Sequence, residues 1–223
     1  MLSTSSTDLQ SLNLNYHFYA DDTQIYIHTR PGQQVNVGHL SNCIVEIKIW
    51  MSNNFLSLNG SKTEVMLLGS PHQLRKVGSP TLSVDGVALE FKTKLRNLGV
   101  IFDATLSFEP FVQNTVKTSF YHLRNIARLR PMLSFSVAEK LINSFVFSRI
   151  DYCNGLLAGV SKSSLDKLQY LQNSAARVLS GVRARDHKPR SWSPCTGYLL
   201  GTVLILKSLC WPINLCTIWY LSI

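Results

Sequence analysis

Two adjacent carboxylates, Asp21 and Asp22, stand between short runs of aromatic and β-branched residues in the segment "HFYADDTQIYIH". This pattern predicts a β-hairpin, "HFYA" followed by "TQIYI", with the two aspartates at or beside its turn. Carboxylates fixed on a rigid turn suit divalent-metal chemistry, because Mg²⁺ binds through one or two carboxylates together with substrate phosphates. Two such ions activate an attacking hydroxyl and stabilise a leaving pyrophosphate. The alternative is a solvent-exposed turn, where aspartate is common.

The composition favours a polyanionic partner, nucleic acid before anionic membrane. The 223 residues include 22 Lys+Arg and 13 Asp+Glu, a formal charge of +9, and a positive potential attracts phosphate regardless of nucleotide sequence. The five cysteines are odd in number and form no CxxC pair, so neither a disulfide framework nor a zinc site is predicted. The first residues lack the basic start and apolar core of a signal peptide, which favours an intracellular location, cytoplasmic or nuclear.

The elements that must position the carboxylates follow from periodicity. Apolar residues recur at helical spacing and predict an amphipathic helix over 37–54; they are Leu40, Ile44, Ile47, Met51 and Phe55. "EVMLLG" and "LRNLGVIFD" each read as a strand, and "TLSVDGVALE" predicts a hairpin around Asp85-Gly86.

Beyond a boundary near 103–107 the chain becomes helical in character. Three segments, 108–130, 134–148 and 161–181, show helical periodicity. In the first, the predicted apolar stripe consists of Val112, Val116, Phe120, Leu123 and Ala127. A β-rich front half is therefore expected to precede a helical back half.

Several motifs together resemble a known family. "YADD" at 19–22 resembles the motif of reverse transcriptases, and "FYADDTQIYI" is similar to the version found in non-LTR (LINE-type) retrotransposons. Segments 47–69, 95–112 and 141–181 resemble, in the same order, three later parts of that family. These parts are the helix–turn–strand after the catalytic hairpin, the primer grip with the start of the thumb, and the helical segment beyond. The resemblance covers about 17–187.

The resemblance implies roles for residues at the hairpin. Asp21 and Asp22 correspond to the metal-binding pair, with Asp21 the more direct ligand, and Tyr19 and Ala20 to positions beside the primer end. Lys62, in "NGSKTE", corresponds to a lysine that helps to protonate the leaving pyrophosphate. A solvated turn lysine is the alternative for Lys62.

The resemblance also implies contacts with nucleic acid. Leu98 and Gly99 correspond to the primer grip, where a glycine allows close approach of the backbone. Lys117, Arg124 and Arg128 recur at i, i+7 and i+11 on the helix 108–130, a spacing that would let a thumb helix follow a phosphate backbone. The alternative is a solvated basic face.

The resemblance implies an α+β fold: a partial antiparallel reverse-transcriptase palm sheet with a packed helix, a helical thumb-like region and an irregular tail. The expected divisions are a polar N-terminal segment at 1–15 and the partial palm at 16–106. The thumb-like region follows at 107–187 and an aberrant tail at 188–223.

In that family a further aspartate on an earlier palm strand completes a two-metal Mg²⁺ site, and fingers residues bind the incoming nucleotide and template. Here the only acid before Asp21 is Asp8, in "SSTDLQS". We therefore expect a truncated RNA-directed DNA polymerase (a nucleotidyltransferase) that is inactive as this chain, with an RNA template and DNA primer as its family partners. A palm without its central strand would expose a sheet edge. The alternative is a nucleic-acid-binding remnant without catalysis.

The tail allows two interpretations. "GYLLGTVLILKSLCWPINLCTIWYLSI" is long enough to span a bilayer, which takes ~20 apolar residues, but Lys207 lies within it and Pro212 follows. A tail-anchored membrane protein is therefore a less favoured alternative, and no stable membrane association is expected. In the second interpretation, residues 193–207 can be encoded by a nucleotide string whose shifted frame resembles what the family carries there. A frameshift near 188–192 is thus our hypothesis, which sequencing of the locus would test.

Overall fold

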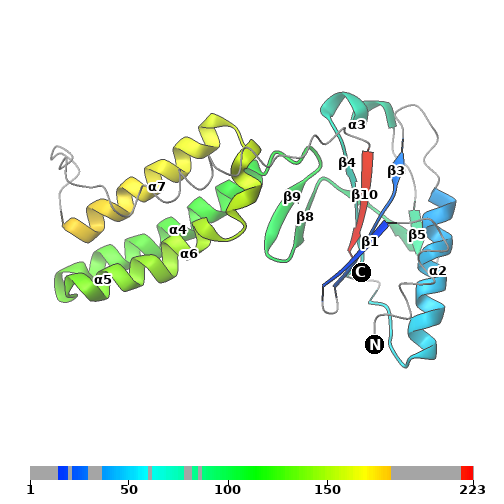
Figure 1. Cartoon of the computed structure of the whole chain (residues 1–223), viewed down its shortest axis with the longest axis horizontal. Coiled ribbons are helices and arrows are strands. Elements are labelled where there is room, and N and C mark those ends of the chain that lie inside the picture. The colour runs from blue at the N-terminus through cyan, green and yellow to red at the C-terminus, as the bar shows by residue number, and fades with distance from the viewer. Residues whose placement is uncertain are drawn as a thin grey trace. The chain divides into compact units, whose positions relative to one another are not determined.

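The computed structural model describes residues 15–19, 22–29, 37–59, 62–77, 82–84, 87–181 and 217–222. The chain is an α+β protein with two compact units (Figure 1). The sheet unit comprises the part of the chain up to Leu106 together with the last residues, from Ile213 onward. The helical unit begins at Ser107.

One mixed sheet dominates the sheet unit. Its strands are β1 (Asn15–Tyr19), β2 (Asp22–Tyr26), β3 (His28–Thr29), β4 (Glu64–Leu68), β7 (Phe91–Lys92) and β10 (Thr217–Ser222). They are arranged in the order β1-β2-β10-β4-β7, and β3 also pairs with β10. All these pairings are antiparallel except that of β4 with β7, which is parallel. The pairing of β4 with β7 therefore differs from the antiparallel sheet that was predicted.

Two small hairpins are also among the described residues of this unit. The predicted hairpin around Asp85-Gly86 is confirmed, since β5 (Leu82–Val84) pairs antiparallel with β6 (Val87–Leu89). "LRNLGVIFD" was predicted as one strand, which is wrong. It forms β8 (Lys94–Asn97) and β9 (Val100–Asp103), which pair antiparallel with each other.

The end of the tail lies at the centre of the sheet. β10 pairs with β2 on one side and with β4 on the other, so it joins two halves of the sheet that do not pair directly. The prediction of an irregular tail is therefore wrong for Thr217–Ser222, and the expected open edge at this place is covered. The segment "TIWYLS" consists largely of β-branched and aromatic residues, which favour strands.

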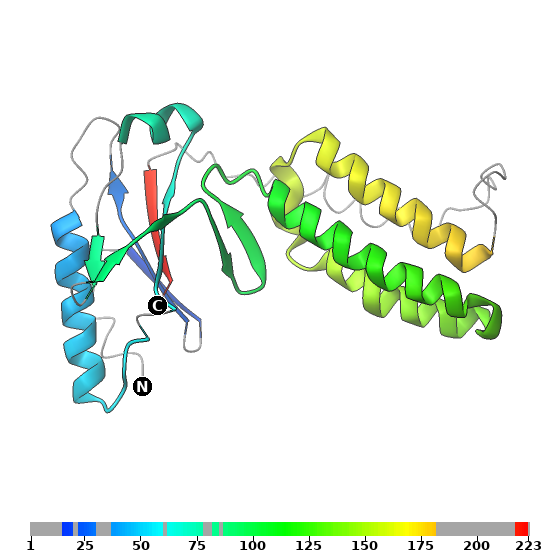
Figure 2. The same cartoon turned by 180° about the vertical axis from the view of Figure 1, so that it is seen from behind.

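Both faces of β4 are covered. Val65 and Leu67 pack on one side with residues of α2 (Val37–Asn53), among them Leu40 and Ile44. Met66 and Leu68 pack on the other side with Leu95 of β8. Figures 1 and 2 show α2 alongside the sheet. Burial on both faces explains why β4 reads as a continuous apolar run rather than an alternating one.

The predicted helix over 37–54 is confirmed by α2, but Phe55 does not belong to its apolar stripe. Phe55 has a left-handed φ of 58° and is fully exposed. It follows the last turn, where the Leu56 N–H donates to the Met51 carbonyl at 2.8 Å, a 6→1 bond that ends the helix. α3 (Pro71–Val77) is the other helix described in this unit.

The described part of the helical unit, 107–181, consists of three long helical segments and short connections. Its elements are α4 (Glu109–Leu129), η1 (Arg130–Met132), α5 (Phe135–Ile142), η2 (Asn143–Phe147), α6 (Ser148–Asp151), η3 (Asn154–Gly159) and α7 (Lys162–Ser180). The helices predicted over 108–130 and 161–181 are confirmed. The helix predicted over 134–148 runs from Phe135 to Asp151, three residues beyond its predicted end. It contains the π-helical turn η2.

Capping residues set the limits of these helices. Ser134 and Ser161 precede α5 and α7, and their hydroxyls accept hydrogen bonds from the backbone N–H groups three residues later. Gly181 follows α7 with a φ of 71°, a conformation that glycine adopts without strain.

The buried face of α4 is rotated from its predicted position. Val112 and Leu123 are buried as expected, but Ala127 is exposed. Burial extends instead over the neighbouring part of the helix surface, at Phe111, Thr115, Ser119 and Ile126. The reason is that α4 contacts both α7 and the α5–η2 segment, so it needs a wider buried face than one partner would require.

Candidate nucleic-acid interface

The predicted carboxylate hairpin forms. β1 pairs with β2 up to the register pair Tyr19 and Asp22, so that only Ala20 and Asp21 connect the strands. Ala20 and Asp21 lie outside the described residues. The Tyr19 side chain is 60% exposed and that of Asp22 is half-buried at the start of β2. The tight pairing places Asp22 at the end of a rigid ribbon, as a metal ligand would require.

The sheet register brings Lys62 to the same edge as Asp22. β2 and β4 are both antiparallel to β10, so they run in the same direction and start at the same edge. Ser222 of β10 lies opposite both Gln24 of β2 and Glu64 of β4. Two strand spacings put the backbones of Gln24 and Glu64 about 10 Å apart.

Lys62 lies in the turn that leads into β4, with an exposed side chain. Its backbone N–H donates to the Asn59 carbonyl at 3.0 Å, and the Thr63 hydroxyl donates to the same carbonyl at 3.1 Å. The turn is therefore held by its own hydrogen bonds, and the exposed Lys62 lies at the edge of the sheet where Asp22 begins its strand.

The described residues do not make up a two-metal site. They contain no group of three His, Cys, Asp or Glu side chains that could hold a metal ion. The nearest acid on β4, Glu64, forms an ion pair with Lys92. Asp21 and Asp22 could bind one Mg²⁺ only together with ligand phosphates, so no catalytic step follows from the geometry of the described residues.

Leu98 and Gly99 form a tight turn between β8 and β9. Asn97 pairs with Val100, and the two residues between them have φ values of 45° and 84°. Two positive φ angles are typical of a type I′ hairpin turn. The positive φ of this turn thus accounts for Gly99. The reason predicted from the sequence was different: close approach of the backbone to the primer. The primer-grip role of both residues stays a prediction.

The three predicted cations of α4 lie on its exposed face. Lys117, Arg124 and Arg128 are all exposed, and the helical rotation of 100° per residue places them opposite the buried residues of α4. None of them forms an ion pair within the described part of the chain. With a rise of 1.5 Å per residue the three span about 16 Å, a length that covers several phosphates of a duplex.

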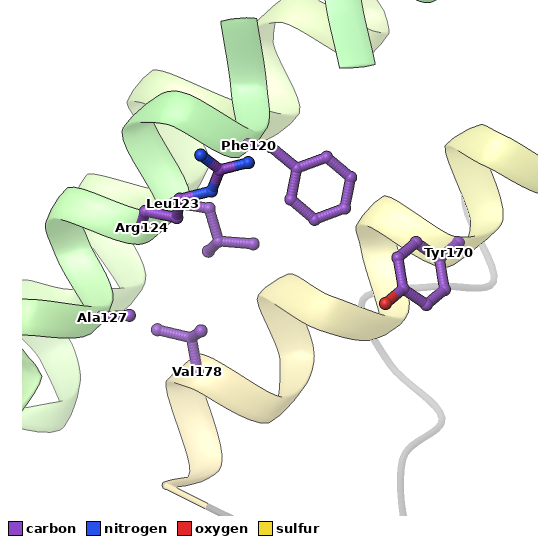
Figure 3. A pocket seen from close by; sticks show the side chains of 6 residues that line it. All are labelled: Phe120, Leu123, Arg124, Ala127, Tyr170 and Val178. Atoms are coloured by element: carbon purple, nitrogen blue, oxygen red, sulfur yellow. The ribbon is translucent and has the colours of Figure 1, made fainter. Parts of the chain in front are cut away.

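An open pocket of about 440 Å³ lies between α4 and α7 beside this face (Figure 3). It is lined by Phe120, Leu123, Arg124, Ala127, Tyr170 and Val178. The rings of Phe120 and Tyr170 are tilted by 42° with centroids 5.8 Å apart, and the Tyr170 side chain is 60% exposed. With its apolar floor and one guanidinium, the pocket can accept a planar aromatic group that carries negative charge nearby.

Two residues outside the predicted site shape this surface. The Arg130 guanidinium donates from Nε and Nη2 to the Leu179 carbonyl at 3.1 and 2.9 Å, and from Nη1 to the Leu133 carbonyl at 2.8 Å. Arg130 is therefore engaged within the fold, although Arg128 two residues earlier is exposed. Tyr170 is an exposed aromatic side chain on a polar helix face, a pattern visible in the sequence that could have marked it.

The membrane alternative rests on a segment that lies outside the described residues, except for strand β10. In the part of the chain that the structure describes, no helix combines the length and the apolar character needed to cross a membrane.

Comparison of the chain with protein-family models, with curated proteins and with solved structures gave no match in any of the three.

Proposed function

We propose that this chain is part of a non-LTR retrotransposon reverse transcriptase and that its helical unit binds an RNA–DNA hybrid through α4. In this proposal the sheet unit corresponds to part of the palm and the helical unit to the thumb. The observation that carries the proposal is the exposed face of α4, where Lys117, Arg124 and Arg128 lie in a row opposite the buried face. Phosphate contacts from such a row position a duplex without reading its sequence.

Two further features support the proposal. Tyr19 and Asp22, the described residues of "YADD", lie opposite each other as the last register pair of β1 and β2. Lys62 lies at the same edge of the sheet as Asp22, as a lysine directed at a polyphosphate would require. These two positions are compatible with the roles that the resemblance implies for Asp22 and Lys62.

We also propose that the chain does not polymerise by itself. The pair Asp21 and Asp22 is one carboxylate cluster, and the strand that lies beside β2, β10, has the sequence "TIWYLS" without an acid. Two-metal catalysis needs carboxylates that hold both ions. Mg²⁺ would bind the pair only together with the phosphates of a nucleotide or primer.

The test is binding to a short RNA–DNA hybrid, measured by fluorescence anisotropy at several salt concentrations. We expect the affinity to fall steeply with salt, because each phosphate contact releases counterions. The triple variant K117A/R124A/R128A should bind at least about tenfold more weakly. Its slope of log K against log salt should be shallower by about 2 to 3, since each phosphate contact contributes roughly 0.9.

A matched control separates the α4 face from net charge alone. The triple variant R75A/K76A/K140A loses the same three charges from exposed positions on α3 and α5. It should keep most of the affinity and the slope of the unmodified chain. Equal losses of affinity in both variants would mean that only net charge attracts the hybrid, which would contradict the α4 interface.

Primer extension tests the catalytic part. With Mg²⁺, template, primer and nucleotides, the chain and its Asp21→Ala variant should both give no product. Extension by the unmodified chain that disappears in the variant would show an active site and refute the proposed inactivity.

A further inference from the structure

Four side chains from α4, η2 and α6 form a cluster that the proposed phosphate contacts do not use. The rings of His122 and Phe145 stack with centroids 5.3 Å apart at 23°, and Tyr121 meets His122 edge-on at 5.4 Å and 79°. Arg149 is the fourth member, with its Nη2 3.3 Å from His122 Nε2. We refer to Tyr121, His122, Phe145 and Arg149 as the aromatic cluster.

The cluster is held in place from within. Arg149 Nε also donates to the Phe145 carbonyl at 3.1 Å. A guanidinium only donates hydrogen bonds, so His122 Nε2 is the accepting atom in this contact. The cluster thus presents flat π faces and one positive charge, in an arrangement that needs little ordering when a ligand binds.

The backbone under Phe145 is irregular. The helix from Phe135 to Asp151 changes to a π-helical turn over Asn143–Phe147 and then returns to α-helix. Within that turn Val146 is fully buried, whereas Phe145 stays 42% exposed beside His122. Single π-helical turns are uncommon and frequently mark functional sites, so this turn indicates a use for the position of the Phe145 ring.

The solvent-exposed surfaces of the Tyr121 and Phe145 rings indicate where a ligand would bind. Tyr121 is 62% and Phe145 42% exposed although both belong to a well-packed unit. Tyr121 follows Lys117 by four residues and precedes Arg124 by three, so it shares their face of α4. A strand whose phosphates contact Lys117 and Arg124 would therefore bring its bases next to Tyr121.

We propose that the aromatic cluster is a stacking platform for the bases of single-stranded nucleic acid. Tyr121 and Phe145 provide the stacking surfaces, and Arg149 adds a cation at their edge. Exposed aromatic side chains beside a basic groove are the means by which proteins hold single strands without sequence preference. This inference rests on the proposed nucleic-acid binding and adds to it the unpaired strand that would extend beyond the hybrid.

The test uses a single-stranded oligonucleotide of about twelve residues that carries 2-aminopurine, whose fluorescence is quenched on stacking. With the full chain we expect quenching on binding. An oligonucleotide of equal length and charge with abasic positions should bind on the order of tenfold more weakly, since each stacked base contributes measurably to affinity.

Variants locate the effect. Tyr121→Leu and Phe145→Leu keep an apolar side chain but remove the ring, and each should reduce quenching and weaken single-strand binding by about tenfold. For Phe145→Leu, binding to the RNA–DNA hybrid should change less than twofold, because Phe145 lies in η2 and not on α4. Phe135→Leu is the matched control, because Phe135 is a 55% exposed ring on α5 outside the cluster.

The outcomes separate this inference from the proposed function. Equal binding of normal and abasic strands by the unmodified chain, with salt-dependent hybrid binding retained, would overturn the stacking platform alone. This comparison needs no variant, so a folding defect cannot obscure it. Absence of binding to both the hybrid and the single strand would overturn the phosphate interface and the platform together.

Discussion

At the scale of single residues, each of the two units buries a hydroxyl or thiol group in its core. Ser119 of α4 is fully buried, and its Oγ has no hydrogen-bond partner among the described residues. Cys43 of α2 is also fully buried, and desolvation, followed by the nearby charge of Glu46, raises the pKa of its thiol to about 12. Each group therefore behaves mainly as a small apolar side chain.

Replacement of Ser119 by Ala should stabilise the helical unit by about 0.5–1 kcal/mol. The change removes a buried hydroxyl without a partner at little cost in packing. Urea unfolding monitored by circular dichroism measures the difference. Ser148→Ala is the control: its hydroxyl donates to the Ser144 carbonyl at an exposed position, and its loss should matter by less than about 0.5 kcal/mol. A loss of stability on Ser119→Ala would show that the hydroxyl is bonded.

Cys43 should resist alkylation in the folded chain. The thiolate is the reactive form, and a pKa of about 12 leaves almost none of it at pH 8. Mass mapping after iodoacetamide treatment should find Cys153, which is exposed, labelled before Cys43. Treatment in urea should label both equally. Rapid labelling of Cys43 under native conditions would mean that the packing of α2 on the sheet opens readily.

At the scale of elements, helix ends and turns decide where the site residues lie. A 6→1 hydrogen bond ends α2 and leaves Phe55 outside it, and two positive φ angles at Leu98 and Gly99 fold one predicted strand into a hairpin. Arg130 has a comparable role for α7, because it satisfies the carbonyl of Leu179 in the last turn of that helix. A cation at a helix C-terminus is also favoured by the helix dipole.

Arg130→Met should destabilise the helical unit by about 1–2 kcal/mol, because it removes charge-assisted hydrogen bonds to a partly buried carbonyl. Arg128→Met offers a matched control two residues away on the exposed face, with an expected change below about 0.5 kcal/mol. Thermal unfolding measures both. Hybrid binding should show the opposite order, with the larger loss for Arg128→Met. The same ranking in both assays would contradict the division between a structural and a binding arginine.

At the scale of the whole molecule, the two units differ in how their contacts are distributed along the chain. The described helical unit is one continuous segment from Ser107 to Gly181, in which the bond from Arg130 to Leu179 joins residues 49 positions apart. The sheet unit requires β10, which lies far along the chain from β2 and β4. Non-local pairing of this kind incurs a larger loop-closure entropy.

Removal of 213–223 should therefore affect the units unequally. Without β10, β2 and β4 each lose their shared partner and expose unpaired backbone groups. Hydrogen exchange followed by mass spectrometry should show loss of protection in β2 and β4 and unchanged protection in α4 and α7. Unchanged exchange in β2 and β4 would mean that the sheet is stable without its central strand.

The amino-acid sequence by itself determined the local elements. Alternating aromatic and β-branched residues predicted the carboxylate hairpin, and helical periodicity predicted α2, α4 and α7, because these patterns act over a few neighbouring residues. The row Lys117, Arg124 and Arg128 was visible for the same reason: spacing on one helix fixes which side chains share a face.

Only the tertiary structure decided the contacts between distant segments. It placed β10 between β2 and β4, brought Lys62 to the edge at which Asp22 begins β2, and stacked Phe145 on His122 across two helices. It also distinguished Arg130, which bonds to a carbonyl on α7, from the exposed Arg128. Such pairings depend on the packing of whole elements, and the propensity of a segment to form a strand or helix does not specify which partner it will meet.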